Sequence, residues 1–308
     1  MSKIKTFFKL LKMPIKLIPP LANNGFLNWM PDETLLKLMY KARMGKTLNL
    51  DNPKSFSEKL QWLKLYDRNP LYTKLVDKYE VRKYIAETIG EEYLIPLYGV
   101  WDHPDEIDFD SLPDQFVLKC THDSGSVIIC DDKSKFDKST AIKKLKKAQK
   151  FNFFYHGREW PYKNVVPRII AEKYMLNSDS SSELSDYKWY CFDGVAKAML
   201  IVTDRQTPGE ETKYDYFDMS FCHQPLLWGG PNATRTIEKP ISFELMRELA
   251  EQISQGIPQV RVDFYEADGH IYFGEMTFYD GCGMSPFQPE KWDAIFGDWI
   301  QLPEKILE

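Results

Sequence analysis

The stretch "RVDFYEADGHIYFGEMTF", residues 261–278, decides the fold of this sequence. Apolar and polar residues alternate on either side of Asp268-Gly269, which is typical of two antiparallel strands joined by a tight turn. Side chains alternate between the two faces of a strand, so Arg261 and Asp263 should share a face. Pairing about the turn places Asp263 opposite Glu275, to within a residue or two.

Two carboxylates that lie side by side repel each other unless a cation sits between them. Mg²⁺ prefers carboxylate oxygens and keeps its remaining positions for water and phosphates. The hairpin therefore predicts a Mg²⁺-nucleotide site, with Arg261 aimed at a phosphate or a developing anion. On the second strand, Phe273, Glu275 and Thr277 should share a face. Removing either carboxylate should relieve repulsion and leave the fold at least as stable. A surface ladder of Arg-Asp-Glu salt bridges is the alternative, and the hairpin alone does not decide between them.

A second group of candidates lies in "FVLKCTHDSGS", residues 116–126. Lys119 is near the end of an apolar strand, and a short polar loop with Ser124, Gly125 and Ser126 follows it. Such a loop offers backbone N–H groups to phosphate oxygens, and the lysine adds a point charge. The sequence does not contain the P-loop pattern GxxxxGK[ST].

Three further stretches supply candidates. Lys78, early on a predicted helix in "VDKYEVR", is a second candidate cation, or else an ordinary helix-surface lysine. "RIIAEKYM" ends an apolar strand with Glu172, followed by a backbone that can bind an adenine edge, and a strand-end salt bridge is the alternative. "DYKWYCFDGVAKAMLIV" predicts a second hairpin about Asp193-Gly194.

Taken in order, these residues resemble the ATP-grasp superfamily, with its DK-type lysine, strand lysine and glycine/serine loop, hinge glutamate, R-x-D strand and E-x-N-type strand. More closely, the chain is similar to the TupA-like ATP-grasp family, which takes its name from teichuronopeptide biosynthesis. The stretches that carry this resemblance span about residues 55 to 280 and are "SFSEKLQWLKLYD", "KLVDKYEVRKY", "YLIPLYGVWD", "LPDQFVLKCTHDSGS", "IIAEKYM", "DYKWYCFDG" and "VRVDFYEADGHIYFGEMTF".

The resemblance implies an α+β fold of the ATP-grasp type, in which two α+β lobes grip ATP, with an N-terminal helical segment. By position, Lys78 and Lys119 would contact phosphates, and Glu172 would lie at the adenine pocket. Asp186 and Lys188 would line the nucleotide cleft. The cofactors implied are ATP and Mg²⁺.

The resemblance also implies that Asp263 and Glu275 hold Mg²⁺. Arg261 would stabilise the acyl phosphate and its tetrahedral successor, with Lys119 as the second catalytic cation. Thr277 departs from the superfamily pattern, which has Asn there, and a hydroxyl is a poorer Mg²⁺ ligand than an amide oxygen. The same threonine suits the "GE-x-TF" pattern of the narrower family.

The segment "DGCGMSPF" after the metal strand looks like a substrate-side loop. Gly281 and Gly283 would permit close approach of the backbone to a ligand.

The order of elements, helices first and then mixed α and β, predicts three parts. We expect an N-terminal helical and basic segment at 1–75, the small lobe at 76–170 and the large lobe with the metal hairpin at 171–308. The chain has 308 residues and a net charge of -5, which argues against a nucleic-acid partner. Five scattered cysteines without a CxxC pair indicate buried thiols in a reducing, cytoplasmic compartment.

Residues 1–16 form a basic amphipathic pattern. Ile4, Phe7, Phe8 and Leu11 share one helical face, and lysines share the opposite face. Two interpretations are open: a helix docked on the body, or a helix that lies on an anionic membrane surface. No apolar run approaches the length of about 20 residues that spans a bilayer.

Three remaining segments bear on function. Residues 205–240 are rich in Gly, Pro and polar residues, which predicts a long functional loop or cover. In "YHGREWPYK", Arg158, Trp160 and Lys163 would stack on a sugar and bind its carboxylate, with a solvated loop as the alternative. "DFD" at 108–110 is a DxD-type pair for a nucleotide-sugar metal, which chance also explains.

The function expected first is an ATP- and Mg²⁺-dependent carboxylate-amine ligase that forms an acyl phosphate and then a C–N bond, with ADP as a product. Its partners would be a small-molecule amine and a glycan or lipid-linked carboxylate, during assembly of a cell-surface polysaccharide. It would act in the cytoplasm or at the inner face of the cell membrane. A glycosyltransferase of a capsule or lipopolysaccharide cluster and a non-catalytic nucleotide-binding module are the alternatives.

Overall fold

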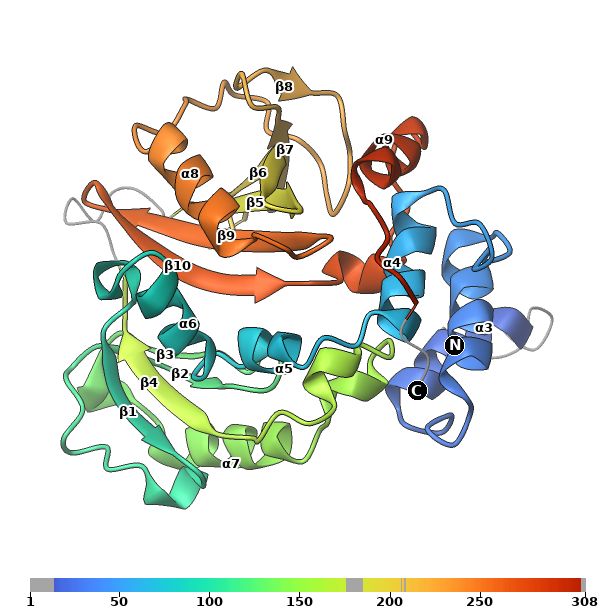
Figure 1. The fold of residues 1–308 in the computed structure, drawn as a ribbon. Helices are drawn as coiled ribbons and strands as arrows, with labels where there is room; N and C mark the ends of the chain where they lie inside the picture. Colours follow the sequence, from blue (N-terminus) through green and yellow to red (C-terminus); the bar gives the residue numbers. More distant parts are fainter. Residues whose placement is uncertain (1–13, 176–184, 206, 208, 306–308) are drawn as a thin grey trace.

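The structure, a computed structural model, describes residues 14–175, 185–205, 207 and 209–305. In this part of the chain the strands form two antiparallel sheets (Figure 1). The smaller sheet has the order β1-β4-β2-β3, and the larger has the order β10-β9-β5-β6-β7-β8. The strands are β1 (Leu97–Trp101), β2 (Phe116–Cys120), β3 (Ile128–Cys130), β4 (Ile169–Lys173), β5 (Asp186–Phe192), β6 (Val195–Thr203), β7 (Lys213–Phe217), β8 (His223–Gln224), β9 (Val260–Ala267) and β10 (His270–Thr277).

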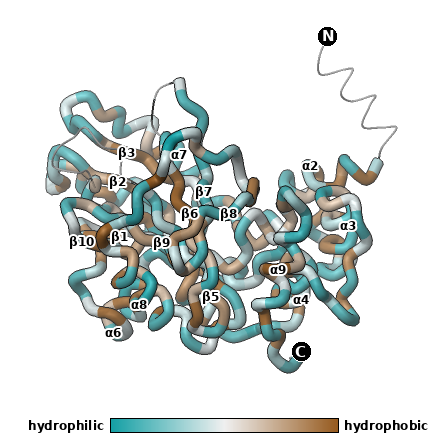
Figure 2. The backbone as a smooth tube through the Cα atoms, turned by 90° about the horizontal axis from the view of Figure 1, so that it is seen from above, coloured by the Kyte–Doolittle hydropathy of each residue, from teal (hydrophilic) through white to brown (hydrophobic). Residues whose placement is uncertain are grey.

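Helices pack on both sheets, and a further group of helices lies beyond one end of the larger sheet. Helix α8 lies over one face of the large sheet, α7 lies under the small sheet, and α3, α4 and α9 gather beyond the sheets (Figures 1 and 2). The described helices are α2 (Ile18–Asn23), α3 (Asp32–Met44), α4 (Phe56–Tyr66), α5 (Leu71–Val76), α6 (Val81–Thr88), α7 (Lys138–Gln149), α8 (Phe243–Ile253) and α9 (Lys291–Trp299). The predicted α+β class with an N-terminal helical segment is confirmed.

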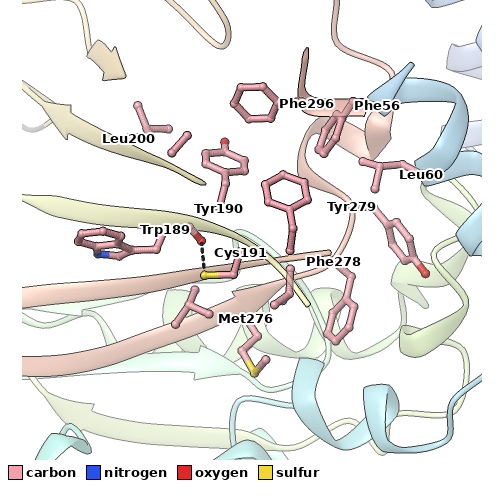
Figure 3. Close-up of a cluster of buried hydrophobic side chains, with 14 of the residues drawn as sticks. Phe56, Leu60, Trp189, Tyr190, Cys191, Leu200, Met276, Phe278, Tyr279 and Phe296 are labelled. Carbon is pink, nitrogen blue, oxygen red and sulfur yellow. Dashed lines mark hydrogen bonds between the residues drawn. The ribbon is translucent and has the colours of Figure 1, made fainter. Parts of the chain in front are cut away.

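Two hydrophobic cores hold these layers together. The larger core joins the N-terminal helices to the six-stranded sheet and α9. Figure 3 shows its centre, where Phe56 of α4 points toward Phe296 of α9, with the ring centroids 5.6 Å apart. The smaller core lies between the four-stranded sheet and α7 and includes Phe116 and Leu145. The N-terminal helices therefore share their core with the large sheet rather than with the small one.

Helix α4 begins with a capping box at Ser55. The hydroxyl of Ser55 accepts the backbone N–H of Glu58 at 3.3 Å, and the Glu58 carboxylate accepts the N–H of Ser55 at 3.2 Å. This reciprocal capping box satisfies two donors that a helix start otherwise leaves unpaired. Ser57, two residues further on, binds Asp293 of α9 through its backbone N–H and its hydroxyl, both at 2.8 Å.

Both predicted hairpins are confirmed. Asp193-Gly194 joins β5 to β6, and Asp268-Gly269 joins β9 to β10. All four turn residues have positive φ, between 48° and 77°. This is the left-handed geometry of two-residue turns that match the twist of the flanking strands, and Asp-Gly tolerates it well.

The expected division of the chain at residues 75 and 170 stays a prediction. The first limit falls at the end of α5, and the second falls inside β4, which pairs with β1 and β2 in the small sheet. The covalent connection to the large sheet therefore follows Lys173 rather than residue 170.

Residues 205–240 do not form one irregular loop. They contain β7 and β8, which extend the large sheet, and the buried side chains of Leu226 and Trp228. The sequence prediction missed β7 because "KYDYF" is short and is flanked by Gly and Pro.

The N-terminal amphipathic pattern lies almost wholly outside the described residues, which begin at Pro14. All five cysteines are described and unpaired. Four are buried, as the sequence predicts, but the expectation of a buried thiol is wrong for Cys222, which is exposed.

Candidate active site

A cleft of about 450 Å³ is lined by residues of both sheets. Cavities of this size bind small molecules and cofactors. The predicted site residues among its lining are Lys78, Lys119, Ser124, Gly125, Glu172, Lys188, Arg261, Glu275 and Gly281. The other predicted residues, Ser126, Asp186, Asp263, Thr277 and Gly283, are not part of that lining.

The β9–β10 hairpin has the register that the sequence predicts. Glu275 of β10 pairs directly with Asp263 of β9, and Thr277 pairs with Arg261. The expectation that Phe273 shares the face of Glu275 is wrong, because the register shifts at Gly274 and Phe273 pairs with Phe264.

Glycine is the residue that this irregularity needs. A Cβ at Gly274 would lie 3.0 Å from the ring of Tyr265 and 3.1 Å from the carbonyl oxygen of Asp263. Both distances are tighter than ordinary van der Waals contact, so a side chain here would require Tyr265 or the strand backbone to shift by a few tenths of an ångström.

Arg261 is the centre of the charge network in the cleft. Its Nε and Nη2 donate to the two oxygens of Asp263 at 2.7 and 2.8 Å, and Nη1 lies 2.8 Å from Asp280. Nη2 also donates to the hydroxyl of Thr277 at 3.1 Å. Burial alone would lower the pKa of Arg261, but Asp263 and Asp280 outweigh it and hold this pKa well above its usual value. Arg261 is therefore a fixed, permanent positive charge.

Lys188 is the second cation on this sheet. It forms an ion pair with Asp263 and lies 3.7 Å from Asp186. Asp186 also pairs with Arg205 at 2.6 Å. Burial raises the pKa of Asp263, but Arg261 and Lys188 outweigh burial and lower it. Asp263 thus ionises readily although it is buried.

The residues fit one mode of Mg²⁺ binding. Among the described residues, no cluster of three His, Cys, Asp or Glu side chains could hold a metal by itself. In nucleotide sites, however, Mg²⁺ takes one or two carboxylates and completes its shell with phosphates and water. Glu275 suits that mode, since its side chain is 40% exposed and lines the cleft. Asp263 would complete the pair if Lys188 moved to a phosphate.

These contacts change the expectation about repulsion. Asp263 is neutralised by Arg261 and Lys188, so its proximity to Glu275 does not strain the hairpin. Removing the Asp263 carboxylate would instead take from two buried cations the partner they share, leaving Asp280 for Arg261 and the more distant Asp186 for Lys188.

On the small-lobe side, Glu172 binds two cations. Its two carboxylate oxygens accept Arg82 at 3.3 Å and Lys119 at 2.8 Å. Lys78 donates to the backbone carbonyl of Asp123, at the start of the polar loop. The predicted lysines and the hinge glutamate are therefore brought together in the cleft.

In the polar loop after Lys119, some residues line the cleft and others stabilise the conformation of the loop. Ser124 and Gly125 line the cleft, and Gly125 has a φ of +110° with open space where a side chain would lie. The hydroxyl of Ser126 accepts the N–H of Cys120 at 3.1 Å and donates to Asp123 at 2.6 Å. Ser126 therefore braces the loop.

The predicted substrate loop has an uncommon backbone. Gly281, Cys282 and Gly283 have φ values of 57°, 59° and 60°, a left-handed run in which glycine is strongly favoured. Lys64 and Gln61 of α4 hold this run by donating to the carbonyl of Cys282 at 2.8 and 3.2 Å.

The two glycines of the loop have different surroundings. Gly281 lines the cleft. Gly283 instead packs against α4, where a Cβ would lie 2.8 Å from the Cβ of Leu60.

Three charged residues of the cleft lining were missed by the sequence interpretation. Arg82 carried a signal, since it follows Lys78 by four residues and belongs to the same helical stretch. Asp280 also carried one, because it directly precedes Gly281. Arg205 had no signal, because only the fold brings its chain segment to the cleft.

The predicted sugar-binding residues lie elsewhere. Arg158 is only 2% exposed and forms an ion pair with Asp32 at 3.0 Å, so it is neither a cleft residue nor part of a solvated loop. Trp160 packs against Tyr72 and Lys163 lies over the ring of Phe154, outside the cleft lining. These side chains hold residues 153–163 on the N-terminal helices.

The acidic pair at 108–110 forms a turn. The carboxylate of Asp108 accepts the N–H groups of Asp110 and Ser111, and Asp110 pairs with Lys138 at 2.9 Å. The pair therefore has a structural role in this loop.

No curated protein sequence matches the chain significantly. Among solved structures, a D-alanine–D-alanine ligase from Bacillus anthracis in complex with ATP is 18% identical, with a TM-score of 0.40, 67% of this chain covered and 55% of the other. The ATP-grasp ligase PsnB with a precursor variant, Mg and ADP is 11% identical, with a TM-score of 0.44, 89% of this chain covered and 70% of the other.

The chain thus spans only about half the length of the first of these ligases, and TM-scores below 0.5 support no argument. The family comparison is stronger. The model of the family described as TupA-like ATPgrasp matches residues 58–301, which is most of the chain and includes every predicted site residue. The chain therefore belongs to the TupA-like ATP-grasp family.

Proposed function

We propose that the protein is an ATP- and Mg²⁺-dependent carboxylate-amine ligase that acts through an acyl phosphate. One observation carries the proposal: cations from both lobes line one cleft together with Glu275, a carboxylate that is open to a metal. Such an arrangement suits phosphoryl transfer, which needs positioning and charge stabilisation more than a nucleophilic side chain. Membership of the ATP-grasp family supports it.

In the first step, an oxygen of the substrate carboxylate attacks the γ-phosphorus of ATP, and ADP leaves. Lys78 and Lys119 would bind the phosphates, with Ser124 and Gly125 beside them and Glu172 toward the adenine. Mg²⁺, when bound at Glu275 and Asp263, would neutralise phosphate charge.

In the second step, the amine attacks the acyl carbon and inorganic phosphate leaves. Arg261 would stabilise the negative oxygen that forms on this carbon. Its fixed position between Asp263 and Asp280 supports that role, since a preorganised donor needs no rearrangement during the reaction.

The substrate class is the finer part of the proposal. The family takes its name from teichuronopeptide biosynthesis, so we propose a uronic-acid-containing glycan as the carboxylate and an amino acid or amino sugar as the amine. Tyr214 supports a sugar ligand, because it lines the cleft and its ring lies against Gly229 and Gly230. The acidic pair at 108–110 gives no support to a glycosyltransferase. A non-catalytic nucleotide-binding module would bind ATP without hydrolysing it, so an assay of turnover distinguishes it from a ligase.

We also propose that residues 1–16 bring the protein to the anionic inner face of the cell membrane. The described residues that follow them support this, because Phe26 and Trp29 are 68% and 77% exposed. Aromatic residues beside a basic segment are typical of membrane-surface contacts. Within the described residues, none of the helices combines the length and apolarity that crossing a bilayer requires.

Phosphate release from ATP tests the proposed function. The purified chain is incubated with Mg²⁺, ATP and a panel of uronic acids and uronic-acid glycans, each with and without amino acids and amino sugars. We expect release that needs both co-substrates, ADP as the nucleotide product, and a hydroxamate when hydroxylamine replaces the amine. AMP and pyrophosphate, UDP from a nucleotide sugar, or ATP binding without turnover would each overturn the proposal.

A further inference from the structure

Asp280 is a cleft carboxylate to which the ATP chemistry assigns no task. It follows β10 as the first residue of a short 3-10 helix (Asp280–Gly283), and its side chain is 25% exposed. One oxygen, Oδ2, accepts the hydroxyl of Tyr190 at 2.6 Å and lies 2.8 Å from Arg261 Nη1. Both partners are buried, so this oxygen is fixed in place.

The other oxygen of Asp280 is available to a ligand. Among the described residues, no side chain or backbone donor contacts Oδ1. Glu172 differs in this respect, because Arg82 and Lys119 take both of its oxygens. Burial and the nearby Asp280 hold the pKa of Tyr190 well above its usual value, so Tyr190 stays a hydrogen-bond donor. Asp280 thus offers one oriented, negatively charged acceptor in the cleft.

We propose that Asp280 binds the ammonium group of the amine substrate and accepts its proton before attack, an inference that rests on the proposed ligase function. Arg261 Nη1 is the neighbour of Asp280 and belongs to the guanidinium that would stabilise the acyl oxygen. An amine held at Oδ1 and an acyl group held at Arg261 therefore lie side by side. This brings the reacting atoms toward the separation of roughly 3–3.5 Å from which attack proceeds.

The proton balance of the step is complete. The ammonium R–NH₃⁺ gives one proton to the Asp280 carboxylate and becomes R–NH₂. Its nitrogen lone pair forms the C–N bond to the acyl carbon. The bond between that carbon and the oxygen that bridges it to phosphorus breaks. The phosphate leaves with that electron pair and takes the second proton from nitrogen, and Asp280 then releases its proton to water.

A purely structural role for Asp280 predicts different behaviour. If Asp280 only held Arg261, its loss would weaken stabilisation of the negative oxygen on the acyl carbon, and attack by every nucleophile would slow equally. If it serves the amine, the loss should depend on whether the nucleophile arrives protonated. Hydroxylamine is mostly unprotonated at neutral pH and needs no base, whereas amino acids and amino sugars arrive as ammonium ions.

The test compares these two nucleophiles in Asp280→Asn. The amine is the one that gives the fastest phosphate release in the wild type, and Glu248→Gln, an exposed carboxylate-to-amide change on α8, is the matched control. General bases contribute roughly 10²–10⁴-fold to a rate. We therefore expect the ratio of kcat/KM for the amine to kcat/KM for hydroxylamine to fall at least tenfold in Asp280→Asn, with no change in Glu248→Gln.

An unchanged ratio, or equal loss with both nucleophiles, would assign Asp280 to Arg261 and overturn the inference while leaving the ligase function intact. A wild type without amine-dependent turnover would overturn both. If Asp280→Asn fails to fold, Asp280→Glu keeps the negative charge beside Arg261 and permits the same comparison. The longer side chain displaces the acceptor, so the ratio should fall in that variant as well, and an unchanged ratio again contradicts the inference.

Discussion

Asp263 and Glu275 are direct partners across the β9–β10 ladder, yet their carboxylates lie in different surroundings. The side chain of Asp263 is 4% exposed and is held by Arg261 and Lys188, whereas that of Glu275 is 40% exposed and faces the cleft. The two members of the proposed metal pair should therefore respond differently to mutation.

Glu275→Gln should abolish Mg²⁺-ATP turnover with little change in stability. The carboxylate is half open to solvent, so its loss disturbs few buried contacts, but an amide oxygen carries no charge for Mg²⁺. We expect turnover to fall by on the order of 10²-fold or more, and the unfolding free energy to change by less than about 0.5 kcal/mol. Glu248→Gln serves as the control, and wild-type turnover in Glu275→Gln would remove Glu275 from the metal site.

Asp263→Asn should lose both activity and stability. Breaking a buried ion pair by removing one partner costs about 3–5 kcal/mol, because the remaining charge stays buried without compensation. The amide can still accept one hydrogen bond, so a loss at the lower end of that range is expected. Urea denaturation without Mg²⁺ measures it, and a variant as stable as the wild type would show that Arg261 and Lys188 find other partners.

Lys119→Ala should raise the KM for ATP and lower kcat. In the proposed assignment the lysine contacts the phosphates in the ground state and the developing charge during transfer, so both parameters should change. We expect kcat/KM to fall at least about tenfold, equivalent to about 1.4 kcal/mol. Glu172 keeps Arg82 as a partner, so the fold should persist. Lys143→Ala on the exposed face of α7 is the control, and a change confined to the carboxylate substrate would place Lys119 in another pocket.

The buried Glu159 predicts a pH dependence of stability. Burial holds its pKa well above the usual value, with Cys282 and Lys64 as the nearest charged or polar groups. Between its ordinary pKa of about 4.3 and the raised native value, the native state holds a proton that the unfolded state has released. Stability conferred by protonated Glu159 is therefore lost as pH rises through this window.

Glu159→Gln does not titrate, so its stability relative to the wild type should increase as the pH rises above the ordinary pKa of a glutamate. Chemical denaturation at several pH values measures the difference, and Glu248→Gln gives the baseline. Parallel stability curves for Glu159→Gln and the wild type would contradict the assignment of a raised pKa.

Residues 1–16 should bind anionic liposomes reversibly. Each lysine near an anionic surface contributes roughly 1 kcal/mol, so binding should weaken steeply with added salt. A chain that lacks residues 1–16 should remain folded, keep its turnover on soluble substrates and fail to sediment with the vesicles. Salt-insensitive sedimentation, or loss of the fold on deletion, would favour a helix docked on the body.

The hairpin was predictable because two independent signals agreed. Alternation set the faces of β9 and β10, and Asp268-Gly269 set the turn, so the pairing of Asp263 with Glu275 followed. The shift at Gly274 could not be predicted, because a glycine within an alternating run is compatible with both registers. What requires the glycine is the approach of Tyr265, a contact that exists only in the folded sheet.

The site was predictable where charged residues end apolar strands, as Lys119 and Glu172 do. It was not predictable where a residue reaches the cleft from an irregular segment, as Arg205 does. The prediction for Arg158 was wrong. A charged residue among aromatic residues suggests a ligand contact, but the guanidinium of Arg158 donates to backbone carbonyls of the N-terminal segment. Whether a charged side chain is buried depends on contacts with residues distant in the sequence, and a local sequence pattern does not predict such contacts.

The contacts of Arg158 have a consequence for how this protein can be shortened. The family match begins at residue 58, but Arg158 is neutralised by Asp32 and donates to the carbonyls of Leu27, Asn28 and Met30. A truncation at the family limit would delete α3 together with Asp32, leave this guanidinium without its counter-ion, and uncover the part of the large core that α3 covers. Sequence similarity marks what relatives share, whereas a cooperative unit ends where its buried contacts end. In this chain the buried contacts begin well upstream of the first residue of the family match.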